Sequence, residues 1–356
     1  MASPFSWPVL VPYALRAPAP VNLGVRHTAH IIAMRIKIKT EDQGSLLPSA
    51  AHVIAGIPED FIFNNEHGLK HPSSAYATSL RLITKEWTVV LNSIDALRYA
   101  LTEETRTHRL LDTTAAYVQL LHKIHEHHDA CTSVVRSLCR ASEAKENKIN
   151  SVFLNSANPI GWKQFRTSTK PHRDDLVGAI VNKIKHDQAE LNSVYLTSAR
   201  DSRFGYYLKG LISPNTLGPD PVVHAGANTA FSFFRDMLIH LWWIYKTGDL
   251  LRDCVRSVIY SKYGEKITPM KKDFPEMQWA SVVARCSKLP PDFFPDEIDK
   301  PHPRIIYANS PECLTLEFPS SARAHRLLGE YRISAFSTVD GAHLTEQAPY
   351  FNYSAK

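Results

Sequence analysis

The chain has 356 residues, of which 44% are hydrophobic, 10% aromatic and 21% charged; this composition can bury a core and excludes a disordered or fibrous chain. Its 41 Lys and Arg against 35 Asp and Glu give a net charge of +6, which permits an acidic partner such as nucleic acid without requiring one. A soluble, mixed globular protein is the class that remains.

The N-terminal 33 residues are rich in proline, with five prolines in the first twenty positions. This stretch lacks the basic start and the clean apolar region of a secretory signal peptide. We expect residues 1–33 to be either an extended arm or an upstream stretch that precedes a native start at Met34. From Met34 the letters MRIKIKT alternate like a strand, so an N-terminal strand and loop region is expected over residues 34–72.

A long helical region follows, because no proline occurs between residues 72 and 159 and no glycine between residues 68 and 161. Apolar residues recur there at steps of three and four, which predicts a first amphipathic helix. They are Leu80, Ile83, Trp87, Val90, Leu91, Ile94, Leu97 and Leu101. A second helix is expected over residues 103–139, with Leu111 and Tyr117 among its inner residues, and antiparallel pairing would bury both apolar faces.

Shorter elements are expected after this pair of helices. Periodic apolar residues predict a third helix from Arg173 to about Leu191, and alternating residues predict a β-hairpin over about 192–212. A fourth helix is expected to begin at a cap formed by Asn228 or Thr229 and to end at Gly248, and a further helical stretch follows directly.

Prolines return at the C-terminal end, with nine between residues 266 and 319. The segments RIIYAN, CLTLEF and YRISAFSTV are typical of strands, and we expect them to form a small sheet with MRIKIKT. The expected fold is therefore mainly α. It is an antiparallel helical bundle over residues 73–263, with an inserted β-hairpin and a small β-rich, Pro-rich C-terminal region over residues 264–356.

Several functional classes are excluded by missing signals. The five cysteines form no CxxC pair, which favours free thiols in a reducing cytoplasm. No apolar run approaches the ~20 residues of a membrane span, so no membrane association is expected. The chain also lacks phosphate-binding glycine loops and the GxSxG and HExxH motifs of hydrolases and metalloproteases. No cofactor is expected.

One cluster of metal-ligating residue types lies on the second predicted helix. His125, His128 and Cys131 are spaced by three and share one helix face, with His122 and His127 beside them. A zinc site needs three or four ligands, usually from more than one segment, and no second pair with such spacing is present. The alternative is a solvated or helix-packing histidine cluster.

The fourth predicted helix carries Arg235, Asp236 and His240. Asp236 and His240 are four apart and lie on one helix face, so the carboxylate is able to orient the imidazole. Arginine binds phosphate and histidine transfers protons near neutral pH, which is the chemistry that metal-independent RNA cleavage requires. The alternative is a buried, hydrogen-bonded polar trio or a structural salt bridge.

This stretch resembles the Arg-(polar)-x-x-x-His motif of the HEPN superfamily, with Asp236 in place of the more common asparagine. The resemblance covers this helix and extends at most over residues 173–263. It implies a helical ribonuclease that acts as a homodimer in toxin–antitoxin or antiviral defence systems and leaves 2′,3′-cyclic phosphate ends. By that resemblance Arg235 and His240 form the catalytic pair and Asp236 orients His240.

A second basic segment, on the third predicted helix, resembles the Asn-x-x-Lys-His segment of the same helical group. Asn182, Lys183, Lys185 and His186 would then contact RNA, or else form an ordinary solvated helix face. The alternative function is a non-catalytic helical scaffold, sensor or partner-binding subunit of a larger complex, since the double tryptophan and Pro-rich ends equally suit protein contacts. A partner such as an antitoxin or another defence protein is expected only in the first case.

Overall fold

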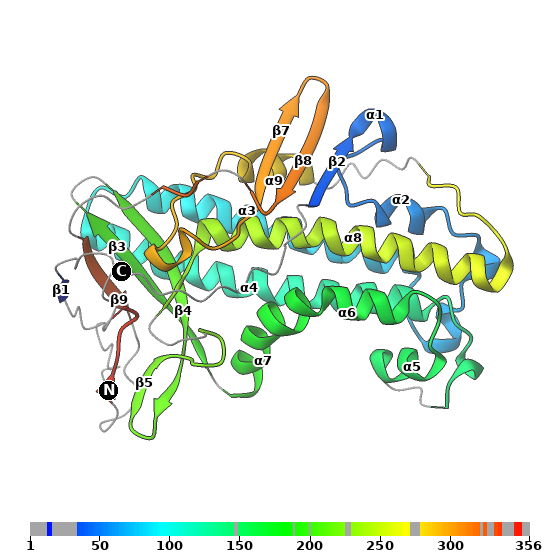
Figure 1. Ribbon diagram of the computed structural model, residues 1–356, viewed down its shortest axis with the longest axis horizontal. Coiled ribbons are helices and arrows are strands. Elements are labelled where there is room, and N and C mark those ends of the chain that lie inside the picture. Colours follow the sequence, from blue (N-terminus) through cyan, green and yellow to red (C-terminus); the bar gives the residue numbers. More distant parts are fainter. Residues whose placement is uncertain are drawn as a thin grey trace, which may run out of the picture.

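Three long helices form the body of the molecule and lie side by side along its longest dimension (Figure 1). They are α3 (Pro72–Arg98), α4 (Glu103–Arg136) and α8 (Phe233–Tyr263). The computed structural model describes residues 13–15, 34–145, 149–187, 189–198, 201–224, 229–270, 278–320, 323–325, 331–336 and 345–350. The predicted arm over residues 1–33 therefore lies outside the described residues, except for one short strand.

The predicted helical hairpin is confirmed by the packing of α3 against α4. The apolar residues that were expected to face the partner helix are buried from Leu80 to Leu97. Leu101 is an exception with 95% of its surface exposed, because α3 ends at Arg98 and Leu101 lies in the turn before α4. Thr102 caps α4 by accepting a hydrogen bond from the backbone N–H of Thr105 at 3.1 Å.

The other helical segments are short. They are α1 (Thr40–Gln43), α2 (Ala50–Ala55), η1 (Glu59–Phe61), η2 (Asn64–His67), η3 (Ala141–Glu143), α5 (Asn150–Ala157), α6 (Trp162–His172), η4 (Arg173–Gly178), α7 (Ala179–His186), α9 (Trp279–Cys286) and η5 (Pro295–Glu297). The predicted third helix, from Arg173 to Leu191, is wrong in both bounds. The helical path begins at Trp162, passes Pro171 and a π-helical segment, η4, and stops before the strand that starts at Glu190.

A seven-stranded sheet lies at one end of the long helices (Figure 1). Its strands are β1 (Tyr13–Leu15), β3 (Glu190–Ser198), β4 (Ser202–Ser213), β5 (Thr216–Pro219), β6 (Phe231–Ser232), β9 (Tyr331–Phe336) and β10 (Thr345–Glu346). The order is β1-β9-β3-β4-β5-β10, with β6 paired to β4; β10 runs parallel to β5 and the other pairs are antiparallel. The predicted β-hairpin is confirmed as β3 and β4, where Leu196 pairs with Arg203.

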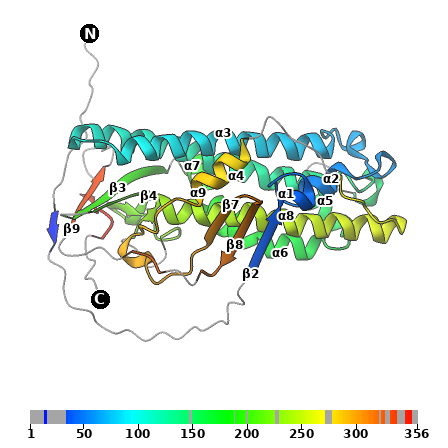
Figure 2. The same ribbon diagram turned by 90° about the horizontal axis from the view of Figure 1, so that it is seen from above.

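A second, three-stranded sheet joins distant parts of the chain beside α8 (Figure 2). It consists of β2 (Met34–Lys39), β8 (Glu312–Phe318) and β7 (Arg304–Asn309), in the order β2-β8-β7. Three of the four predicted strands thus pair as expected. The fourth, YRISAF, belongs to the large sheet instead, where β9 pairs with β3.

The predicted fold class is therefore wrong. A helical bundle with one inserted hairpin does not describe a chain in which the hairpin is the centre of a seven-stranded mixed sheet. Burial explains the difference: five consecutive residues of β3, from Asn192 to Leu196, are buried, so both faces of the strand are covered. Tyr195 belongs to the main apolar core, whereas Val194 and Leu196 pack with Phe294 and Ile333 in a second apolar cluster.

The fourth predicted helix also differs from its expected bounds. The expected cap Asn228 lies outside the described residues, and Thr229 precedes β6 instead of capping a helix. The helix α8 does not end at Gly248 but continues to Tyr263. Gly248 is explained by packing instead, because an added Cβ would lie 2.5 Å from Cβ of Pro48. Over the described part of the chain, the structure contains no helix whose length and apolar character would let it span a membrane.

We predict that Gly248→Ala destabilises the protein by about 1–3 kcal/mol, because the added methyl collides with the rigid ring of Pro48. Thermal unfolding monitored by circular dichroism measures the change. Arg256→Ala, at an exposed position of the same helix, is the control and should stay within about 0.5 kcal/mol of wild type. An unchanged or higher melting temperature for Gly248→Ala would show that the segment around Pro48 does not approach α8 so closely.

Candidate functional site

The middle of α8 carries the Asp236–His240 pair that the sequence indicates. The four-residue spacing brings both side chains to one helix face, and Nε2 of His240 lies 3.2 Å from Oδ2 of Asp236. Both residues are buried, with 1% and 0% of their surface exposed. The expected pairing of carboxylate and imidazole is present, but it lies inside the core.

Two tyrosines complete the surroundings of the Asp236 carboxylate. The hydroxyls of Tyr117, from α4, and Tyr206, from β4, donate to Oδ2 at 2.6 and 2.5 Å. Burial raises the pKa of the Asp236 carboxyl, but the His240 ring and the two phenols lower it to about 2. Burial also raises the pKa of both phenols well above their usual range, and the carboxylate adds to this. Asp236 is therefore an anion surrounded by donors.

A chain of three buried histidines continues from Asp236 and crosses three helices. Nδ1 of His240 lies 2.8 Å from Nε2 of His172, the last residue of α6. Nδ1 of His172 lies 2.9 Å from Nε2 of His128 on α4. Burial lowers the pKa of His172 and His128 well below the usual value of histidine. We call His128, His172 and His240 the histidine chain.

The end of α6 positions His172 in this chain. Its ring stacks on Trp243 of α8, with ring centroids 5.4 Å apart. The π-helical η4 begins directly after His172, and an added Cβ on Gly178 at its end would lie 2.4 Å from the carbonyl oxygen of Arg173. Sequence reasoning missed His172, because it lies between Pro171 and a π-helical segment and so belongs to no regular helical period.

Arg235 does not join the Asp236–His240 pair. Its Nη2 donates to the carbonyl oxygen of Pro301 at 2.9 Å, and its Nη1 lies 3.7 Å from Oε1 of Glu297. Glu297 is buried and accepts hydrogen bonds from the backbone N–H groups of Ser232 and Phe294. Burial raises the pKa of Glu297 to about 7, although Arg235 lowers it. The expected catalytic trio is therefore divided between two environments.

The predicted metal-ligand cluster of α4 does not converge on one point. His128 belongs to the histidine chain, whereas Sγ of Cys131 lies 3.6 Å from Nε2 of His127. Nδ1 of His127 lies 2.8 Å from the hydroxyl of Ser79, and His125 is half-buried. Among the residues that the structure describes, no group of three or more His, Cys, Asp or Glu side chains is arranged to hold a metal ion.

The predicted RNA-contacting residues lie on α7 and differ in their exposure and in their ion pairs. Asn182, Lys185 and His186 are exposed. Lys183 is committed to an ion pair instead, because its Nζ lies 2.9 Å from Oδ2 of Asp220. The sequence thus identified an exposed basic helix end, with one of its two lysines neutralised.

Sequence reasoning missed that this basic character extends through α6 and η4. Residues 162–186 contain six Lys or Arg and two Asp, a net charge of +4 against +6 for the whole chain. Four of the cations recur at steps of three and four and so share one side of α6 and its extension. The side chains of this surface, which we call the basic face, are Lys163, Arg166, Lys170, Arg173 and Lys185; all are exposed except Arg173, whose side chain is only 16% exposed.

The basic face is only partly neutralised. Lys170 pairs with Asp175 at 2.7 Å and Arg173 with Asp174 at 2.8 Å. Arg166 donates to the neutral amide of an asparagine, and neither Lys163 nor Lys185 forms an ion pair within the described ranges. In Figure 1 the helices α6 and α7, which carry these residues, lie below the long helices, on the side opposite the three-stranded sheet.

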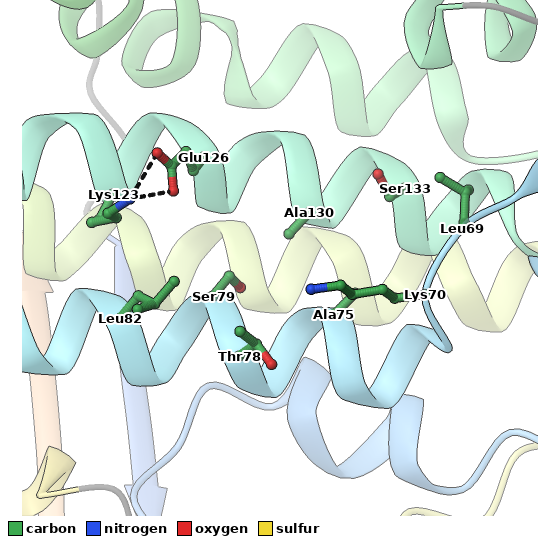
Figure 3. Close-up of a pocket in the computed structure, with 10 residues that line it drawn as sticks. All are labelled: Leu69, Lys70, Ala75, Thr78, Ser79, Leu82, Lys123, Glu126, Ala130 and Ser133. Atoms are coloured by element: carbon green, nitrogen blue, oxygen red, sulfur yellow. Dashed lines mark hydrogen bonds and ion pairs between the residues drawn. The ribbon is translucent and has the colours of Figure 1, made fainter.

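A pocket of about 250 Å³ lies between α3 and α4 (Figure 3). Leu69 and Leu82 contribute apolar surface, and the Lys123–Glu126 ion pair, with atoms 2.8 Å apart, lies at one end. Ser79 lines it with a hydroxyl that already contacts His127. Within the described residues, none of the buried polar atoms that lack a partner belongs to this lining, so the pocket does not select a ligand by itself.

No family model, no curated protein and no solved structure matches the chain.

We predict that acid destabilises the protein as the pH falls from about 6.5 toward 4. Burial lowers the pKa of His127 and His224 to about 4, so the unfolded chain binds more protons in this window. Each histidine removes up to about 3 kcal/mol from the free energy of unfolding, and His128 and His172 act in the same direction. Urea unfolding at pH 7.5 and 5.0 tests this, and equal midpoints would refute it.

Glu297 should act in the opposite direction, because its folded pKa of about 7 exceeds the model-compound value of 4.5. The folded state binds the proton more tightly, so the contribution of Glu297 to stability is lost as the pH rises from 4.5 through 7. The stability of Glu297→Gln relative to wild type should improve by about 1–3 kcal/mol between pH 5 and 8. Glu317→Gln, at a partly exposed carboxylate, is the control and should show no such trend. A constant difference for Glu297→Gln would contradict the account.

Proposed function

We propose that this protein is a non-catalytic, cytoplasmic RNA-binding subunit that contacts RNA through the basic face. The observation that carries the proposal is the concentration of charge: residues 162–186 hold a net +4 of the chain's +6. Phosphate contacts by Lys and Arg provide most of the sequence-independent affinity for nucleic acid. The free cysteine thiols fit a reducing compartment.

The geometry of the basic face suits a charged, extended ligand. Lys163, Arg166 and Lys170 follow one another along one side of a helix at steps of about 5 Å. Arg173 continues the row, but its guanidinium donates to Asp174 and Thr169. Arginine binds phosphate oxygens bidentately and lysine acts as a mobile point charge, so the face combines both modes. Lys185 on α7 is a further exposed cation.

Burial of the Asp236–His240 pair supports the non-catalytic part of the proposal. A general base must come within hydrogen-bond distance of the proton that it removes. His240 is fully buried, with His172 on one ring nitrogen and Asp236 beside the other. Arg235 is engaged with Pro301 and Glu297, so the phosphate-stabilising cation is also committed elsewhere.

A HEPN-type endoribonuclease is the second candidate, and one observation favours it. The Asp236 carboxylate lies 3.2 Å from Nε2 of His240, so the polar residue and the histidine of the motif are side by side. In this case Tyr117 and Tyr206 would have to move away from Asp236 when the protein forms a homodimer or binds an antitoxin or another defence partner. Incubation of the protein with RNA in excess EDTA separates the two candidates. Intact RNA supports the binding function, and cleavage that is lost in His240→Ala supports the ribonuclease.

We predict that removing three cations of the basic face weakens RNA binding. The variant combines Lys163→Gln, Arg166→Gln and Lys185→Gln, all at exposed positions. Binding of a fluorescent single-stranded RNA, followed by anisotropy, should weaken at least about tenfold at low salt. The slope of log affinity against log salt concentration should decrease by about 2, since each lost phosphate contact removes about 0.7.

The matched control removes three exposed cations from α3, by Arg81→Gln, Lys85→Gln and Arg98→Gln. This variant has the same net charge as the first but an intact basic face, so its salt slope should remain that of wild type. Equal losses in the two variants would mean that only net charge matters. Absence of RNA binding by the wild type would refute the proposed function.

A further inference from the structure

The tautomer of each ring in the histidine chain follows from Asp236. The carboxylate is an anion and only accepts hydrogen bonds, and Nε2 of His240 lies 3.2 Å from it, close but not aligned as a regular hydrogen bond. The charge of the carboxylate favours the tautomer of His240 that carries its hydrogen on Nε2. Nδ1 of His240 is then an acceptor for Nε2–H of His172 at 2.8 Å. In the same way, Nδ1 of His172 accepts from Nε2–H of His128 at 2.9 Å. Each ring of the histidine chain thus carries its hydrogen on Nε2, the nitrogen that is directed toward Asp236.

The far end of the histidine chain lies at His128. Nδ1 of His128 is buried and has no hydrogen-bond partner, and in this arrangement it holds a bare lone pair. Arg173 of η4 and His125 and His127 of α4 are the charged or titratable groups close to it. His127 is engaged with the hydroxyl of Ser79. Neither Nδ1 of His128 nor Nε2 of His240 has an aligned hydrogen-bond partner, but only the nitrogen of His240 lies beside an anion, and this difference gives the histidine chain its direction.

The two ends also differ in charge. Tyr117, Tyr206 and His240 surround the Asp236 anion with neutral donors, and Trp243 stacks on the middle ring. The closest arginine in sequence, Arg235, is directed to Glu297 instead. One buried negative charge thus lies at one end of a row of three imidazole rings.

We infer that the histidine chain is a proton relay that carries one proton from His128, beneath the basic face, to the ring of His240 beside the Asp236 carboxylate, and thereby links RNA binding to pH. A proton bonds to Nδ1 of His128, and the Nε2–H proton of His128 moves to Nδ1 of His172. The Nε2–H proton of His172 then moves to Nδ1 of His240. The charge ends on His240 beside Asp236, no ring rotates, and the two other histidines are left as neutral Nδ1–H tautomers.

The position of the open end connects the relay to the basic face. His172 directly precedes Arg173, which is part of that face. The η4 segment packs over α4 here, since an added Cβ on Gly178 would lie 3.9 Å from Cδ2 of His125. A polyanion on the face favours protonation of the relay beneath it, and by reciprocity a protonated relay binds the polyanion more tightly. This link rests on the proposed function, whereas the relay itself does not.

Nitrogen-15 NMR of the histidine rings tests the relay in the free wild-type protein. When the histidine chain takes up one proton on acidification, we expect His172 and His128 to change from the Nε2–H to the Nδ1–H tautomer, with the charge on the ring beside Asp236. This concerted change of tautomer is the signature of transfer along the chain. A titration in which His172 keeps its Nε2–H, or in which His128 alone becomes charged, would overturn the relay.

Calorimetric titration with RNA in buffers of different ionisation enthalpy tests the link to binding. At about pH 6, binding to wild type should take up about one proton, and His172→Gln should take up none while keeping the same salt slope. His186→Gln, on the exposed surface, should retain the uptake. Loss of uptake in His186→Gln but not in His172→Gln would overturn the link. Failure to bind RNA would overturn the proposed function and with it the link, while the NMR signature still decides the relay.

Discussion

The buried carboxylate of Asp236 is the interaction on which the rest of the structure depends. An isolated charge in an apolar core is costly, and this one is stabilised only because donors from three elements converge on it. Tyr117 connects Asp236 to α4 and Tyr206 connects it to β4. His240, which lies beside Asp236, connects it through His172 to α6. A single anion thus fixes how the long helices, the large sheet and the basic helical segment meet.

The same network separates the interior of the molecule from the surface that we propose to bind RNA. The Asp236–His240 pair has the spacing of a catalytic motif, but its neighbours occupy the positions that a substrate would need. The cations that remain accessible lie on α6 and α7, outside the motif. The basic face, which adjoins the buried Asp236 network, is therefore a better candidate for a binding site than the network itself.

The sequence predicted features that depend on local spacing and missed those that depend on the meeting of distant segments. The hairpin of α3 and α4 and the pairing of Asp236 with His240 follow from periods of three and four residues, and both are present. Tyr117 was expected only as a core residue of its helix. No periodicity indicates that a strand residue such as Tyr206 would reach the same carboxylate oxygen.

Two further differences between the expected and the observed fold have physical causes that cannot be read from a single sequence. The glycine that was expected to end a helix, Gly248, instead allows Pro48 to approach the continuous helix α8. The hairpin of β3 and β4 was taken as a minor insertion, because its partner β9 lies more than a hundred residues later in the chain. Pairings of such long range are set by the burial of both sheet faces rather than by local pattern.

Hydrogen exchange with and without single-stranded RNA, followed by mass spectrometry, tests the central claim most directly. The account predicts slower exchange in peptides that cover residues 162–186 and unchanged exchange in the α8 segment around Asp236 and His240. Altered exchange in that α8 segment, with residues 162–186 unaffected, would contradict it, because RNA would then act on the buried network rather than on the basic face.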